Sequence, residues 1–133
     1  GVVTELKRIS RDYNISVIVV SSLNRMNYLT PIAFESFKES GGIEYTADVV
    51  WGLQLQAIHG EEMHDTKTSI GKKRQIIENA KKANPRQIEL VCLKNRNGIS
   101  NYSCAFEYYP KYDLFISQDN YSIEFNQGNR TVI

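Results

Sequence analysis

The 133-residue chain has few cysteines, no long apolar run and almost no net charge. Two cysteines, Cys92 and Cys104, cannot form the disulfide framework of a small secreted domain. No apolar run approaches the roughly 20 residues that a membrane span requires. Sixteen Lys and Arg residues against fifteen Asp and Glu residues leave a net charge of +1, which excludes a surface that is wholly polycationic or polyanionic. These absences indicate a reduced, soluble, cytoplasmic protein.

The composition is that of one folded domain, with 41% hydrophobic and 23% charged residues. Apolar residues at helical spacing predict an amphipathic helix over about residues 2–13. The run Ile15–Val20 is short, β-branched and almost wholly apolar, which is typical of a strand covered on both faces in a parallel sheet. A second central strand is expected over Ala47–Leu55, with Asp48 capping the turn before it.

Residues 57–86 differ from their surroundings, because they are polar and rich in charge. Isoleucines with helical spacing predict a surface helix over Ser69–Ala83, ended by Asn84-Pro85. The segment is expected to be an excursion between two strands.

Alternating residues from Gln87 to Leu93, followed by Asn95-Arg96-Asn97-Gly98, predict a β-hairpin over 87–108. The two cysteines would lie on its two arms and serve as packing residues. A short edge strand is expected at 114–116. The polar residues 117–133 would form either a weak last hairpin or a loose tail.

Metal and nucleotide motifs are not evident in the sequence. His59 and His64 are five residues apart, whereas the zinc-protease helix places its histidines four apart, so we expect no metal site. Gly71-Lys72 is not part of a phosphate-binding loop, because no glycine stands at the required spacing before Gly71 and no strand precedes it.

Three polar segments can bind an anion. Ser21–Arg25 follows the first expected strand, at the edge where open α/β sheets bind ligands. Phe37–Gly42 combines a lysine with glycines whose backbone N–H groups can approach a phosphate. Lys94 and Arg96 are two residues apart, so on an extended strand they point the same way and would hold two cations at a hairpin tip. Solvated loops and a solvated hairpin tip account for the same residues.

Taken in order, these segments resemble the C-terminal half of the RecA-like motor domain of DnaB-like replicative helicases. The resemblance runs from Leu6 to about Phe115. The segments that carry it are LKRISRDYNISVIVVSSLNR, FKESGGIEYTADVV and IELVCLKNRNG. The excursion resembles a version in phage or mobile-element relatives.

The resemblance implies an α/β fold: a partial RecA-like (P-loop NTPase) sheet with flanking helices and a C-terminal β-hairpin. It divides the chain into residues 1–116, the C-terminal portion of the ATPase domain, and residues 117–133. The phosphate-binding loop and the magnesium aspartate of the Walker strands would lie upstream of Gly1. We therefore interpret the chain as a fragment that does not hydrolyse ATP alone, with ATP and Mg²⁺ as cofactors of the complete protein.

The resemblance also assigns roles to single residues. Arg96 would be an arginine finger, and Lys94 its companion, at the γ-phosphate held by a neighbouring subunit of a ring, expected to be a hexamer. Phosphoryl transfer is catalysed by positioning and charge neutralisation, which such a finger supplies. Lys38, Glu39 and Gly41 would contact single-stranded DNA, and Lys38 replaces the usual arginine with a point charge.

The loop after the first expected strand would sense the nucleotide through Ser22, Asn24 and Arg25. Ser22 stands where the family usually has a glutamine, and serine is shorter and has no amide group. Coupling between hydrolysis and DNA movement is therefore in question.

Two other functions compete with the helicase motor. One is a non-catalytic, truncated DNA-binding or assembly module from a phage or mobile element, which Ser22 and the missing upstream motifs favour. The other is a RecA-like recombination or clock-type ATPase, against which FKESG and KNRNG together argue.

Overall fold

The computed structural model describes residues 1–25, 28–38, 40–118, 123–125 and 130–132. The described helices are α1 (Val2–Tyr13), α2 (Ser40–Thr46), α3 (Glu61–His64) and α4 (Ile70–Lys82), with 3₁₀ turns η2 (Phe34–Ser36), η3 (Gln56–His59) and η4 (Pro110–Tyr112). The described strands are β1 (Val49–Leu55), β2 (Arg86–Asn95), β3 (Tyr102–Tyr109), β4 (Leu114–Ser117), β5 (Ile123–Phe125) and β6 (Arg130–Val132).

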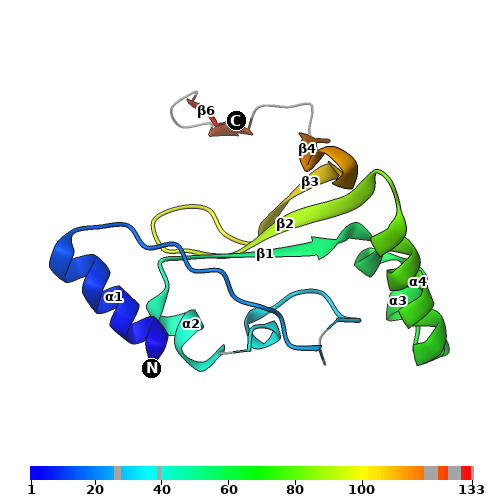
Figure 1. The fold of residues 1–133 in the computed structure, drawn as a ribbon, viewed down its shortest axis with the longest axis horizontal. Helices are drawn as coiled ribbons and strands as arrows, with labels where there is room; N and C mark the ends of the chain where they lie inside the picture. Colours follow the sequence, from blue (N-terminus) through cyan, green and yellow to red (C-terminus); the bar gives the residue numbers. More distant parts are fainter. Residues whose placement is uncertain (26–27, 39, 119–122, 126–129, 133) are drawn as a thin grey trace.

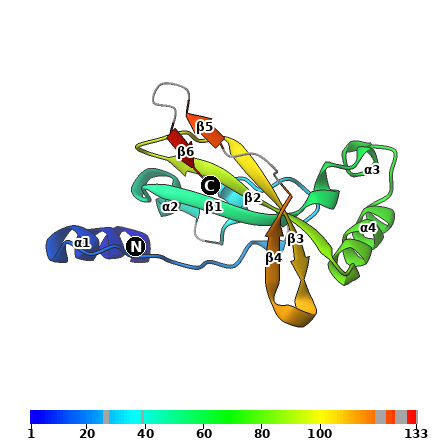
Figure 2. The ribbon, with the colours of Figure 1, turned by 90° about the horizontal axis from the view of Figure 1, so that it is seen from above.

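The first four strands form one sheet in the order β1-β2-β3-β4, and each neighbouring pair is antiparallel (Figure 1). The predicted hairpin is confirmed: Leu90 of β2 lies opposite Leu53 on β1 and Cys104 on β3. The expected edge strand is β4. β5 and β6 form a separate antiparallel pair within residues 117–133. The result is a mixed α/β fold, with α1 and α2 at one end of the sheet and α3 and α4 at the other (Figures 1 and 2).

The prediction of a buried parallel strand at Ile15–Val20 is wrong. These residues belong to no described strand, and Ile18 and Val20 are 91% and 94% exposed. A strand that is apolar on both faces needs neighbours on both sides and layers above and below it. The described residues supply neither to this segment.

The predicted central strand at 47–55 also differs in its surroundings. β1 is paired only with β2 and therefore lies at the edge of the described sheet. Its side chains alternate: Val50 is buried, whereas Trp51 and Leu53 are 56% and 51% exposed. One face of the sheet is covered by Ile32 and Phe37, which pack on Val50, and the side chains of Trp51 and Leu53 are open to solvent.

The excursion between β1 and β2 has its own core. Ile58 of η3, Met63 of α3 and Ile77 of α4 are buried together, which holds α4 against the end of the sheet. The helix predicted over Ser69–Ala83 is confirmed as α4. Ser69 caps it by accepting a hydrogen bond from the backbone N–H of Lys72 at 3.1 Å.

The hairpin connection is longer than a tight turn at residues 95–98. The β2–β3 ladder ends where Cys92 lies opposite Tyr102, and β2 continues beside β1 until Asn95 lies opposite Val49. The backbone N–H of Gly98 does bond the Asn95 carbonyl, at 3.3 Å. Lys94 and Arg96 are therefore positioned by the β1–β2 pair rather than by a narrow β2–β3 tip.

Candidate functional site

Arg96 lies in an exposed ionic cluster centred on Asp48, the residue before β1. Its guanidinium group is 2.8 Å from an Asp48 carboxylate oxygen, and its backbone N–H donates to the Asp48 carbonyl at 2.8 Å. Lys7 of α1 donates to the other carboxylate oxygen at 2.6 Å. The cluster ties α1, the start of β1 and the end of β2 together. The Arg96 side chain remains 43% exposed, so it is not part of a core.

The end of α2 provides further acceptors for the two candidate catalytic cations. Lys94 donates to the Glu44 carbonyl at 2.7 Å, and Arg96 donates to the Tyr45 carbonyl at 3.4 Å. Carbonyl groups in the last turn of a helix have no intrahelical partner and attract cations. The sequence prediction placed Lys94 and Arg96 on one face, and the structure brings both side chains to this helix end.

Asp48 is the acidic centre of this cluster. The hydrogen bond from Lys7 holds the pKa of Asp48 below its ordinary value of 3.8; partial desolvation opposes the shift, and the charges of Lys7, Arg96 and Lys94 add to it. The carboxylate is therefore ionised at neutral pH. Sequence reasoning treated Asp48 only as a turn residue and missed its role, because Lys7 and Arg96 are distant from it in the chain.

The expected nucleotide-sensing loop and the expected DNA loop lie side by side. Leu23 forms an isolated antiparallel bridge with Phe37, and the backbone N–H of Asn24 donates to the Ser36 carbonyl at 2.6 Å. Ser22 and Arg25 are exposed on one side of this contact, and Lys38 is exposed on the other. Glu39 lies outside the described residues, and Gly41 is in the first turn of α2.

Helix α2 separates the DNA loop from the cation pair. Gly41 is near its beginning, whereas Lys94 and Arg96 bond carbonyls near its end. At 1.5 Å per residue, the seven-residue helix is about 10 Å long. The predicted DNA-contacting and phosphate-contacting residues therefore form two groups joined by one short helix, and not one pocket.

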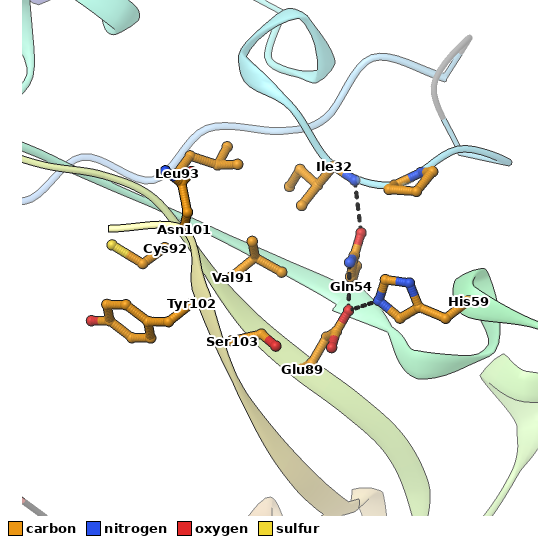
Figure 3. A pocket seen from close by; sticks show the side chains of 11 residues that line it. Ile32, Gln54, His59, Glu89, Val91, Cys92, Leu93, Asn101, Tyr102 and Ser103 are labelled. Carbon is orange, nitrogen blue, oxygen red and sulfur yellow. Dashed lines mark hydrogen bonds and ion pairs between the residues drawn. The ribbon is translucent and has the colours of Figure 1, made fainter. Parts of the chain in front are cut away.

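A second polar cluster borders an open cavity of about 230 Å³ on the covered face of the sheet (Figure 3). The Glu89 carboxylate is 8% exposed; it accepts from the Gln54 amide at 2.6 Å and contacts the His59 ring. Gln54 in turn accepts from the backbone N–H of Ile32 at 2.8 Å. These contacts link Ile32, Gln54, Glu89 and His59 in one series, so the cluster fixes the loop around Ile32 to β1.

The sequence prediction missed the buried carboxylate of Glu89. The only available signal was an acidic residue in the middle of an apolar strand. Within the described residues, no three His, Cys, Asp or Glu side chains are grouped as metal ligands. Cys92 and Cys104 are both free, and they lie on neighbouring strands without being directly opposite. None of the described helices is long and apolar enough to cross a membrane.

The fold is consistent with part of a RecA-like domain, in which a mixed α/β sheet carries polar loops at its ends. The family model of the DnaB-like helicase C-terminal domain matches residues 1–117. The chain therefore belongs to the DnaB-like helicase family, as the C-terminal region of a replicative helicase. Neither the search of curated proteins nor the search of solved structures found a match. For the complete helicase, the family implies ATP and Mg²⁺ as cofactors, and single-stranded DNA and a hexamer as partners.

Proposed function

We propose that this chain supplies a trans-acting arginine finger and a contact with single-stranded DNA to a cytoplasmic, hexameric, ATP-driven helicase. The observation that carries the proposal is the position of Arg96: it follows the rigid β2 strand, is 43% exposed, and lies beside Lys94 within the matched region. Arg96 is the finger, and Lys94 places a second positive charge at the same phosphate.

The side chains of Arg96 and Lys94 suit a triphosphate whose other contacts come from a neighbouring subunit. A guanidinium group and an ammonium group match the oxygens of a γ-phosphate, which in this proposal a neighbouring subunit holds together with Mg²⁺. ATP bound there would supply the phosphoryl group. The contribution of this chain is to place positive charge where negative charge develops in the transition state.

Asp48 competes with the phosphate for Arg96. Exposed ion pairs contribute only about 0–1 kcal/mol to stability, so replacing the Asp48 carboxylate by a multiply charged phosphate costs little free energy. The bond to Asp48 then keeps the guanidinium ordered while no nucleotide faces it. Ser22, Asn24 and Arg25 would sense the nucleotide from the loop that adjoins Phe37.

The proposed DNA contact involves Lys38, Glu39 and Gly41. Lys38 is exposed, and Gly41 offers backbone without a side chain at the start of α2. Contacts of this kind bind phosphates without reading sequence, and their strength falls as the salt concentration rises.

The test is steady-state ATP turnover by the complete protein with Arg96→Ala. Loss of a finger lowers turnover by a factor of about 10³–10⁵ while ATP binding is retained. Lys111→Ala, an exposed lysine on η4, is the matched control and leaves turnover unchanged. Wild-type turnover by Arg96→Ala would contradict the finger assignment.

A non-catalytic DNA-binding or assembly module is the second candidate. The bond between Arg96 and Asp48 within one chain favours it, because it shows that Arg96 also has a structural partner. In that case Arg96→Ala leaves ATP turnover unchanged and weakens ring assembly, which sedimentation velocity measures.

A further inference from the structure

The positive charge of this protein is concentrated in one segment that the proposed function does not use. Residues 66–86 contain seven Lys or Arg residues and a single acidic residue, Glu78. The remainder of the chain contains nine basic and fourteen acidic residues. The segment thus carries a charge of +6 and the remainder −5, although the whole chain is nearly neutral. The seven cations are Lys67, Lys72, Lys73, Arg74, Lys81, Lys82 and Arg86.

Four of these cations are exposed side chains of α4: Lys72, Arg74, Lys81 and Lys82. Arg74, Lys81 and Lys82 are exposed and follow the spacing i, i+7, i+8, which places them on one side of the helix. The helix itself is fixed to the sheet by buried Ile77. Two of its exposed cations form ion pairs, Lys72 with Glu62 at 2.9 Å and Lys81 with Glu78 at 3.1 Å. The helix therefore displays a row of three cations, in which Lys81 is partly neutralised by Glu78, while Arg74 and Lys82 carry most of the positive charge.

The row adjoins the loops to which the nucleotide-sensing and DNA-contacting roles were assigned. Lys81 lies 5.6 Å from the ring centroid of Tyr28, and a cavity of about 260 Å³ is lined by Leu23, Tyr28 and Lys81. Leu23 also bridges Phe37, the neighbour of Lys38. The contacts of Leu23 thus link the neighbour of Lys38 to Lys81 of α4, and α4 lies at the end of the sheet opposite α1 and α2 (Figure 2).

We propose that the outer side of α4 binds the phosphate backbone of nucleic acid and extends the contact that begins at Lys38. A row of lysines and arginines neutralises successive phosphates and releases their counterions, without reading bases. The exposed ring of Tyr28 beside Lys81 adds an aromatic surface on which an unpaired base can stack, which favours a single strand. The charge argument is independent of the helicase assignment, whereas the continuity with Lys38 rests on the proposed function.

The test uses the complete protein and fluorescence anisotropy with a labelled oligothymidylate over a range of salt concentrations. Arg74→Glu/Lys82→Glu changes the charge by four at two exposed cations. We expect at least a tenfold loss of affinity, and a salt slope that falls by about 1.4, or 0.7 for each lost contact. The matched control, Arg11→Glu/Lys111→Glu, changes the charge equally at exposed sites on α1 and η4, and keeps its affinity within a factor of about three.

The other outcomes are decisive as well. An equal loss in both double variants would reduce the effect to net charge and overturn the proposal. If Lys38→Ala weakens binding and Arg74→Glu/Lys82→Glu does not, α4 is not a contact and the proposed DNA loop stands. If the wild type binds no DNA at all, both the α4 contact and the proposed DNA loop are wrong.

Competition by duplex DNA distinguishes the two forms of nucleic acid. Equal competition by polyglutamate would indicate an acidic protein partner instead and contradict the proposal. Arg74→Gln/Lys82→Gln, which removes charge without adding any, guards against misfolding.

Discussion

At the scale of single residues, Arg96 forms an ion pair with Asp48, and the proposed function gives the same guanidinium group a phosphate as its alternative partner. Both side chains are about half exposed, and Lys7 holds the carboxylate from the other side. The pair is too exposed to contribute much stability, since water and salt screen it. Its main consequence is orientation: Arg96 is ordered beside the end of α2 while its guanidinium remains accessible.

Asp48 makes the stability of the fold depend on pH. Its pKa is lower in the folded chain than in the unfolded chain, so the unfolded state binds more protons at acid pH. The contribution of Asp48 is present above about pH 4, the unfolded value, and is lost as pH falls through the lower folded pKa. Asp48→Asn is therefore expected to flatten the dependence of unfolding free energy on pH in that acid range, as measured by urea denaturation. Glu61→Gln, at an exposed site on α3, is the control; an unchanged slope in Asp48→Asn would contradict the assignment.

At the scale of secondary structure, local sequence pattern predicted the elements whose hydrogen-bonding partners are close to them in the sequence. The helical spacing of α1 and α4 and the alternation with a turn signal in the β2–β3 hairpin were sufficient, because each element satisfies its own backbone bonds or those of its neighbour. The strand predicted at Ile15–Val20 is absent because it depends on a partner that is not close to it in the sequence. Its composition suits a strand, but a strand forms only where another strand offers a hydrogen-bonding edge. No periodicity contains that information.

The candidate site was predictable to the same degree. Lys94 and Arg96 were assigned to one face of a strand from their spacing. Their contacts with α2 and Asp48, and the contact between Gln54 and Glu89, join residues more than 30 positions apart. Such contacts depend on how the elements pack, which the sequence pattern did not specify.

Gly52 of β1 is a sensitive point in that packing. A Cβ atom at this position would lie 2.9 Å from Cγ1 of the buried Ile32 side chain, closer than carbon atoms approach. Gly52→Ala is expected to push the loop around Ile32 away from the sheet and to destabilise the fold by about 1–3 kcal/mol, measured by urea denaturation. Gly71→Ala, where a Cβ meets nothing within 4 Å, should not destabilise. Equal stability of both variants would contradict the packing described for β1.

The attachment of α4 depends on one side of the helix. Ile77 is 5% exposed, whereas Ile70 of the same helix is 62% exposed. Ile77→Ala is expected to lower the free energy of unfolding by about 2–5 kcal/mol, because it leaves a cavity among Ile58 and Met63. Ile70→Ala supplies the matched control and should cost much less. Comparable losses in thermal unfolding would mean that α4 does not pack as described.

At the scale of the whole molecule, the groups with assigned or proposed roles are distributed over the sheet. Arg96 and its partners lie at the end near α1 and α2, the loop that adjoins Lys38 crosses the covered face, and the basic row of α4 lies at the far end (Figure 1). The side chains of Trp51 and Leu53 are open on the other face. This arrangement suits a domain that faces a nucleotide and a nucleic acid through different surfaces.

The most direct test of the proposed trans action mixes two inactive variants of the complete helicase. One carries Arg96→Ala and keeps its nucleotide pocket; the other keeps Arg96 and has an inactivated phosphate-binding loop. In mixed rings, Arg96 of the second variant faces the intact pocket of the first, so ATP turnover is expected to recover to a substantial fraction of the wild-type rate. Turnover that stays at the level of the separate variants, in rings shown to contain both, would contradict the action of Arg96 on a neighbouring subunit.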